Sequence, residues 1–148
     1  MSFELQIVLK LLLAMILGGI IGWEREVGRR PAGLRTHILV CLGATLITIL
    51  AIFIGENYSH LGSIDSTRII AGIVTGIGFL GAGAIIHAKE SVRGLTTAAS
   101  IWLVAAIGIA IGCGFYFSAI ITVIFTMIVL IFLLQMEKAL ERRRDKKN

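Results

Sequence analysis

Two short segments concentrate the residues that could carry polar chemistry. Residues 22–37, which read GWEREVGRRPAGLRTH and are named the first elbow here, contain two glutamates and four arginines. Residues 87–98, HAKESVRGLTTA, form a shorter second elbow with one glutamate, one lysine and one arginine. Carboxylates and guanidinium groups form charge-assisted hydrogen bonds with one another or with a charged ligand. These residue types therefore allow two interpretations: an ion-pair network that locks the elbows together, or a docking and ligand surface.

The glutamates of both elbows need a cation nearby. Glu24 and Glu26 follow the C-terminal end of a predicted helix, where the helix dipole makes a carboxylate unfavourable. The nearest candidate cations are Arg25, Arg29, Arg30 and Arg35. In the second elbow, Glu90 stands in the same relation to Lys89 and Arg93. Ion pairs are therefore expected in both elbows.

Other kinds of chemistry find little support in the sequence. His37 and His87 flank the elbows, but two histidines without suitable acids are not a metal-binding signature. The sequence shows no nucleophile–base pair, no cofactor motif and no soluble domain with a pocket. We therefore expect neither an enzyme nor a cofactor or metal site.

The acidic residues avoid the middle of the apolar runs. All nine lie at the ends of these runs or outside them: Glu4, Glu24, Glu26, Glu56, Asp65, Glu90, Glu137, Glu141 and Asp145. Ion and proton carriers usually bury an ionisable residue in the membrane, and Mg²⁺ prefers carboxylate and water oxygens. This distribution weighs against a self-sufficient cation transporter.

The elements that position these residues are predicted to be transmembrane helices. The chain has 148 residues, of which 57% are hydrophobic and 16% charged, a composition outside the range of ordinary soluble domains. Apolar runs of about 20 residues can cross a bilayer as helices. We predict an all-α polytopic membrane protein with five spans, at about Leu5–Gly22, Ile38–Ile54, Ile69–Ile86, Ala98–Gly112 and Phe115–Gln135.

The boundary between the last two spans is inferred from length. Residues 98–135 form one apolar stretch of 38 residues, which as a single helix would measure about 57 Å, nearly twice the hydrocarbon core. Gly112-Cys113-Gly114 is the most favourable place for the chain to turn. A re-entrant segment after this turn is the alternative to two full crossings.

The basic residues predict the orientation. If the N-terminus is outside, twelve of the 14 Lys and Arg residues fall on the inner side, and only Lys10 and Arg68 fall outside. The positive-inside rule then places both elbows and the C-terminus in the cytoplasm. Residues 1–136 would form the transmembrane domain and residues 137–148 a basic cytoplasmic tail. Topology and anionic lipid account for the net charge of +5 without any nucleic acid.

Local signals predict helix starts and one buried cation. Thr36 and either Thr96 or Thr97 are expected to cap the helices that follow the elbows, since threonine hydroxyls bind free backbone amides. Lys10 lies inside the first apolar run. Its side chain can extend outward to the membrane surface, or it can face the bundle with Asp65 or Glu56 as partner.

Residues 68–86, RIIAGIVTGIGFLGAGAII, are rich in glycine. Gly72, Gly76, Gly78, Gly81 and Gly83 are predicted to pack helices together, because glycine lets backbones approach closely within a bilayer. The helix that carries them is therefore expected to be central and contacted on two sides. An unwound segment that exposes carbonyl groups to an ion is the alternative.

The first four spans carry a faint repeat. Residues 33–36, GLRT, align with residues 94–97, GLTT, and the alignment places Leu42 opposite Leu103 and Ala44 opposite Ala105. Both pairs of spans have the same predicted topology. We therefore expect two parallel helical-hairpin repeats about an axis along the membrane normal, followed by a fifth helix.

Five sequence blocks occur in the order and at the spacing of one known family. They are WERE at 23–26, AGLRT at 32–36, DSTRI at 65–69, GIGFLGAG at 76–83 and VRGLTTAA at 92–99. On these blocks, the chain from about Leu11 to Gly114 resembles the MgtC/SapB family of bacterial inner-membrane proteins. The resemblance implies a multi-pass protein of the bacterial plasma membrane linked to magnesium limitation, acid stress or survival inside host cells.

The resemblance also implies which residues to consider. Its candidate functional or partner-binding positions are Glu24, Arg25, Arg35, Thr36, Asp65, Arg68, Arg93 and Thr97. Members of that family have been described as regulators of other membrane proteins, including the ATP synthase, and also as magnesium transporters. Many members continue into a small cytoplasmic α/β domain, whereas this chain stops at ERRRDKKN. Functions of that domain are therefore not expected here.

Two hypotheses follow from these observations. The first is a non-enzymatic, oligomeric modulator of a partner membrane protein, such as the ATP synthase or a cation transporter, in magnesium homeostasis or stress adaptation. Its glycine-rich faces would mediate helix contacts and its elbows would recognise the partner. The second is a magnesium or other cation transporter or channel that forms its pathway only as an oligomer.

Overall fold

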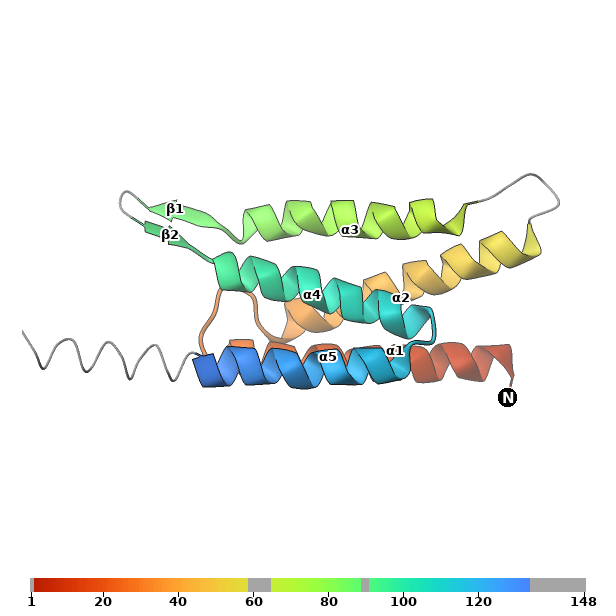
Figure 1. The fold of residues 1–148 in the computed structure, drawn as a ribbon, viewed down its shortest axis with the longest axis horizontal. Coiled ribbons are helices and arrows are strands. Elements are labelled where there is room, and N and C mark those ends of the chain that lie inside the picture. Colours follow the sequence, from red (N-terminus) through yellow and green to blue (C-terminus); the bar gives the residue numbers. More distant parts are fainter. Residues whose placement is uncertain (1, 59–64, 89–90, 134–148) are drawn as a thin grey trace, which may run out of the picture.

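The computed structural model describes residues 2–58, 65–88 and 91–133, and it is a bundle of five helices. The helices are α1 (Phe3–Val27), α2 (Leu34–Asn57), α3 (Ser66–Gly83), α4 (Leu95–Gly112) and α5 (Tyr116–Ile128), which continues as a π-helical segment, η2 (Val129–Leu133). Two short antiparallel strands, β1 (Ile86–Ala88) and β2 (Ser91–Arg93), connect α3 to α4. Figure 1 shows the helices side by side, with both elbows at one end of the bundle.

The helices have the length and composition of membrane spans. Helices α1 to α4 are each long and apolar enough to cross a bilayer, and α5 with η2 forms a shorter apolar helix over residues 116–132. Their outer faces carry large exposed apolar side chains, among them Phe79 at 83% exposure and Phe117 at 79%. Side chains of this kind are suited to lipid, since the hydrocarbon core is as apolar as they are. The prediction of an all-α membrane protein is confirmed.

The central helix is α2, and four glycines hold its neighbours against it. Gly18 and Gly22 of α1 contact one side of α2, and Gly108 and Gly112 of α4 contact the other. A Cβ at Gly22 would lie 2.8 Å from Leu34 Cα, and a Cβ at Gly108 would lie 2.5 Å from the Cys41 carbonyl oxygen. Each pair has the GxxxG spacing that lets membrane helices approach closely. Glycines therefore pack helices together as expected, but these glycines lie on α1 and α4 and not on α3.

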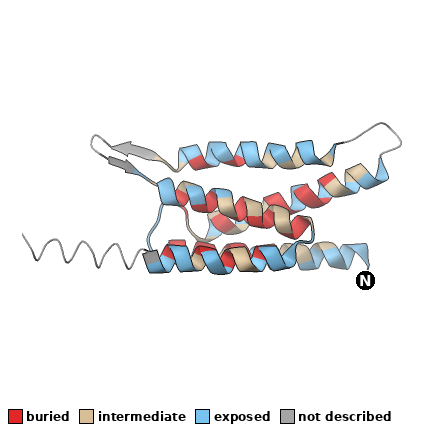
Figure 2. Cartoon of the chain, in the orientation of Figure 1, coloured by how far each residue is buried: buried red, intermediate tan, exposed pale blue. Residues whose placement is uncertain are grey.

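Helix α3 lies at the edge of the chain, so the prediction that it is central is wrong for a single chain. Figure 2 shows buried residues gathered in the α1–α2–α4 part of the bundle and few of them along α3. Gly72, Gly76, Gly78 and Gly83 would each have open space around an added Cβ, and only Gly81 lies against a neighbouring helix, at Ala98. Among the described residues of one chain, the other four glycines thus pack against nothing.

The turn between α4 and α5 falls where glycine spacing predicts it. Helix α4 ends at Gly112, and Gly114 adopts φ +85°, a left-handed conformation that glycine adopts readily. The amides of Gly114 and Phe115 donate to the carbonyls of Ile111 and Ala110, at 3.0 and 2.8 Å. This is a Schellman motif, the common way to end a helix and reverse the chain. Helix α5 then runs back along the bundle beside α1 (Figure 1).

Candidate functional site

The first elbow begins with a compact helix end. The amides of Arg29 and Arg30 donate to the carbonyls of Glu26 and Arg25, both at 3.0 Å, which forms a second Schellman motif. The left-handed position is occupied by Arg29, with φ +52°. A side chain is unfavourable in this conformation, so the elbow keeps an arginine where glycine would be the usual residue.

The carboxylate of Glu26 caps the next helix. Its Oε2 accepts a hydrogen bond of 3.0 Å from the amide of Leu34, the first residue of α2. A Cβ added at Gly33 would collide with this carboxylate, so the contact requires glycine there. Negative charge at a helix N-terminus is also favoured by the helix dipole. The prediction that Thr36 caps this helix is therefore wrong, because Thr36 lies inside its first turn and the cap comes from α1.

The first elbow also contains an ion pair between two adjacent residues, Glu24 and Arg25. Arg25 Nε donates to Glu24 Oε2 in a short ion pair, and Arg25 is only 2% exposed. Removing one partner of a buried ion pair strands the other charge. This ion pair lies within the first elbow and does not join it to the second, and Arg25 has little surface left for a partner protein.

A buried histidine links the first elbow to α4. His37 Nδ1 lies 2.8 Å from the Gly33 carbonyl oxygen, and Nε2 lies 3.0 Å from Ser100 Oγ on α4. The Ser100 hydroxyl also lies 2.8 Å from the carbonyl oxygen of Thr97, one turn earlier. His37 is completely buried, as is nearly all of Ser100 and Thr97. The histidine therefore lies at the point where α1, α2 and α4 meet, which is named the elbow junction here.

The sequence predicts no role for His37, and it marks Ser100 only as one of the few hydroxyl side chains within the predicted spans. His37 directly precedes the predicted span Ile38–Ile54, so its position in the sequence does not indicate that it is buried. The pair also has the geometry of a nucleophile beside a base, contrary to expectation. However, Ser100 is buried on α4, and its hydroxyl already lies within hydrogen-bond distance of the Thr97 carbonyl and of His37 Nε2.

The second elbow is built differently from the first. It is the β1–β2 hairpin, with Ile86 opposite Arg93, and the chain enters α4 through Gly94 at φ +90°. A Cβ at Gly94 would collide with the Ala84 carbonyl, so this glycine allows the start of α4 to lie against the end of α3. The predicted caps Thr96 and Thr97 again lie inside the first turn of the helix. Lys89 and Glu90 lie outside the described residues.

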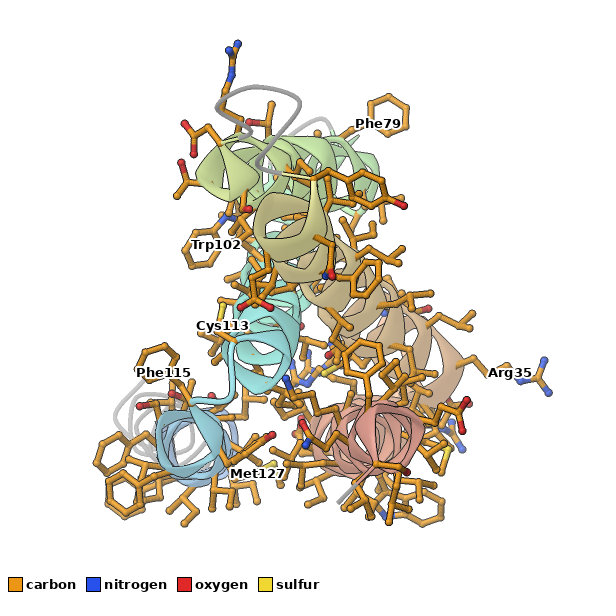
Figure 3. All side chains as sticks on the ribbon, turned by 90° about the vertical axis from the view of Figure 1, so that its right-hand side faces the viewer. Arg35, Phe79, Trp102, Cys113, Phe115 and Met127 are labelled. Atoms are coloured by element: carbon orange, nitrogen blue, oxygen red, sulfur yellow. The ribbon has the colours of Figure 1, made fainter. Side chains whose placement is uncertain are left out.

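Exposed cations surround the elbow junction. Arg29, Arg30, Arg35 and Arg93 are all exposed, and Figure 3 shows the Arg35 side chain extending away from the bundle. These four arginines, named the arginine rim, form the accessible charged surface at this end. Of the candidate residues at the elbows, only Arg35 and Arg93 belong to it, since Arg25 and Thr97 are buried and Glu24 is occupied by Arg25.

The remaining candidates lie at the opposite end of the bundle. Asp65 caps α3 by accepting a hydrogen bond of 2.9 Å from the Thr67 amide. Hydrogen bonds from the Thr67 hydroxyl and amide lower the pKa of Asp65. Arg68, whose amide donates to the Asp65 carbonyl at 3.1 Å, is exposed beside it. The structure therefore divides the candidate residues between the two ends and does not assemble them into one site.

Comparison with known proteins identifies the family to which the five sequence blocks belong. The model of the MgtC family matches residues 11–139, which include α1 from residue 11 onward and all of α2 to α5. This chain belongs to the MgtC family. Relatives include a Haemophilus influenzae protein that is 44% identical over 123 residues, which cover 80% of this chain and 52% of the relative.

Two further MgtC relatives have informative names. YhiD of Escherichia coli K12, whose name associates it with magnesium transport, is 42% identical over 128 residues, 84% of this chain and 59% of YhiD. Protein MgtC of Brucella abortus is 43% identical over 130 residues, 86% of this chain and 51% of the relative. The chain thus spans about half the length of these MgtC relatives. No solved structure matches it.

Lys10 lies well inside α1 of this MgtC chain, whereas Arg25, Arg35 and Arg68 lie within two residues of a helix end. Its Nζ donates a hydrogen bond of 2.7 Å to the carbonyl oxygen of Gly112, at the C-terminal end of α4. A cation is favoured there by the helix dipole. Lys10 therefore faces the bundle, but it binds backbone and neither Asp65 nor Glu56. In the part of the chain that the structure describes, no cluster of three or more His, Cys, Asp or Glu residues could hold a metal.

Proposed function

We propose that this chain is a non-enzymatic component of the bacterial plasma membrane that modulates a partner membrane protein in magnesium homeostasis or in adaptation to acid or host stress. Membership of the MgtC family supports a magnesium-related membrane protein. The proposal that the chain modulates a partner is based on which of its surfaces are packed and which remain open.

The observation that carries the proposal is an open groove between α2 and α3. It has a volume of about 480 Å³ and is lined by Leu39, Val40, Gly43, Ala44, Ile47, Ile69, Gly72, Ile73, Gly76, Ile77 and Leu80. Gly72 and Gly76 repeat the GxxxG spacing of α1 and α4, but no neighbour among the described residues fills the space beside them. Apolar surface with paired glycines is suited to receiving another transmembrane helix. In this proposal, the helix belongs to the partner or to a second copy of the chain.

The proposed orientation places the arginine rim in the cytoplasm, with the N-terminus outside and the C-terminus inside. Twelve cytoplasmic Lys and Arg residues against two outside support it. Arg35 and Arg93 would then contact acidic groups of the partner at the membrane surface, while α3 contacts its helix. Asp65 and Arg68 would contact the outer part of the partner.

The alternative is an oligomeric transporter or channel for magnesium or another cation. The name of YhiD favours it. Polar groups also occur along the interface of α2 with α4, where Thr45 Oγ1 donates to the Gly108 carbonyl at 3.0 Å. These groups are satisfied by one another, and the glycine contacts bring the backbones together around them. A pathway would therefore have to form between chains.

A matched pair of glycine variants tests the proposed docking groove. Gly76→Leu fills the groove, whereas Gly78→Leu adds the same side chain to α3 outside the groove lining. We expect Gly76→Leu to lose membrane proteins that co-purify after cross-linking and to lose growth support at low magnesium, and Gly78→Leu to retain both. Equal behaviour of the two variants, at equal amounts of inserted protein, would contradict the proposal.

A further inference from the structure

The hydrogen bonds around His37 leave one proton undetermined. The Gly33 carbonyl oxygen can only accept, so Nδ1, at 2.8 Å from it, must carry a hydrogen. The Ser100 hydroxyl has a single hydrogen and two acceptors within reach, the Thr97 carbonyl at 2.8 Å and His37 Nε2 at 3.0 Å. Which of them receives this hydrogen depends on whether Nε2 is protonated.

Both protonation states give a complete set of hydrogen bonds. With a neutral imidazole, Ser100 donates to Nε2. With an imidazolium, Nε2 donates to Ser100 Oγ, and Ser100 donates to the Thr97 carbonyl. The two patterns use the same heavy-atom positions and differ by one proton, which His37 takes up and Nε2 holds. Geometry therefore permits either state, and the surrounding charges decide between them.

The charges around His37 come almost entirely from α1. Arg25 and Glu24 are the charged groups that act on it from that helix, and α1 is close because a Cβ at Gly22 would lie 3.0 Å from His37 Cβ. From α4 the facing groups are the hydroxyl of Ser100 and the backbone of Thr97. On α2 itself, Arg35 is exposed and the thiol of Cys41 lies one turn further in. The ionisable residue of α3, Arg68, lies at the opposite end of the bundle.

A proton added to His37 would change the charge balance among His37, Arg25 and Glu24. In the neutral state, the guanidinium of Arg25 is matched by the carboxylate of Glu24. An imidazolium adds a second positive charge to this buried site, where the Glu24 carboxylate is already paired with Arg25. Charge buried without its own partner is unfavourable. Protonation should therefore weaken the contact of α1 with α2 at the elbow junction.

We propose that His37 is a proton-responsive contact of the elbow junction, neutral in the packed state, whose protonation in acid loosens the packing of α1 and α4 on α2. The inference does not depend on the identity of a partner or an ion, and it holds for a modulator and for a transporter alike. Its failure would leave the proposed function standing, and the reverse is also true.

The chain contains a matched control. Thr45 and Gly108 form the corresponding hydrogen bond between α2 and α4, eight residues further along both helices, and they include no titratable group. Ser100→Ala removes the partner of Nε2, whereas Thr45→Val removes a hydrogen bond of the same kind elsewhere on the same interface. The two variants separate a proton-dependent role from a merely structural one.

The test is nitrogen-15 NMR of histidine-labelled protein in lipid nanodiscs between about pH 5 and pH 8, with His37→Gln used to assign the signal. We expect a neutral imidazole with hydrogen on Nδ1 near neutral pH and reversible conversion to the doubly protonated form in acid. Thermal unfolding should occur at a temperature lower by roughly 2–4 °C in acid. Ser100→Ala should shift the midpoint of the conversion, and Thr45→Val should leave it unchanged.

Two results would overturn the inference. One is a His37 signal that keeps a single protonation state at every pH where the protein stays folded. The other is an equal shift of the midpoint in Ser100→Ala and Thr45→Val, which would show that any weakening of the α2–α4 interface has the same effect. If His37→Gln does not fold, the signal can be assigned instead from substitutions at His60 and His87.

Discussion

The two helical hairpins of this chain use the same residue type in opposite ways. In the first hairpin, Gly18 and Gly22 press α1 onto α2 so closely that no side chain would fit between them. In the second, α4 is held on α2 by Gly108 and Gly112, but α3 leaves four of its five glycines beside open space. Glycine spacing therefore shows where a helix can be approached, and the fold decides whether the approaching helix comes from the same chain.

The elbows of the two hairpins also differ in how their charged residues are held. The first elbow fixes three of its charged side chains, with Glu26 capping α2 and Glu24 paired with the buried Arg25. Its other arginines, Arg29, Arg30 and Arg35, are exposed. The second elbow is a short β-hairpin from which Arg93 is exposed. The first elbow is thus held by contacts between its own side chains, whereas the second is held by backbone pairing. The predictions below test this contrast.

The largest effect is expected from filling the two kinds of glycine site. Gly22→Leu should abolish stable folding, since its side chain would overlap Leu34 and His37 and cost more than about 4 kcal/mol. Gly72→Leu should change the free energy of unfolding by less than about 1 kcal/mol, because its site is open in the single chain. Reversible unfolding in mixed micelles measures both. Equal destabilisation would show that α3 is as tightly packed as α1.

A smaller effect is expected from removing an arginine at each elbow. Arg25→Ala leaves the Glu24 carboxylate, whose side chain is 14% exposed, without its partner, and should lower the free energy of unfolding by about 3 kcal/mol. Arg93→Ala removes an exposed charge and should change it by no more than about 0.5 kcal/mol. The same unfolding measurement applies. Equal stability of both variants would refute a structural role for the Arg25–Glu24 ion pair.

The smallest effect concerns the two Schellman motifs. Arg29 and Gly114 occupy equivalent left-handed positions, at φ +52° and φ +85°. Arg29→Gly should raise the free energy of unfolding by up to about 1 kcal/mol, and Gly114→Arg should lower it by about 1 kcal/mol. If Arg29→Gly instead destabilises the protein, the arginine side chain makes a contact that outweighs its backbone strain.

Much of this architecture could be read from the sequence. Apolar run lengths predicted the spans, and glycine spacing predicted the turn at residues 112–114, because both depend on local properties of the chain. The family resemblance was also visible in the sequence, since each of its five blocks is a short run of adjacent residues.

The errors share a physical cause. Local rules predict caps at Thr36 and at either Thr96 or Thr97, but one cap comes from Glu26 on another helix and the other position is filled by Gly94. The central helix was assigned by counting glycines, and counting cannot reveal which helices face each other. The contact between His37 and Ser100 joins residues 63 positions apart and leaves no local signal.

The measurement that tests the central claim most directly is magnesium flux into proteoliposomes carrying the purified, inserted protein and an enclosed fluorescent reporter. Arg35→Ala is the control variant, since Arg35 is exposed and its loss leaves the buried Arg25–Glu24 pair intact. A modulator predicts no flux above that of empty liposomes. Saturable flux that the variant lacks would contradict the account and would make this protein a transporter.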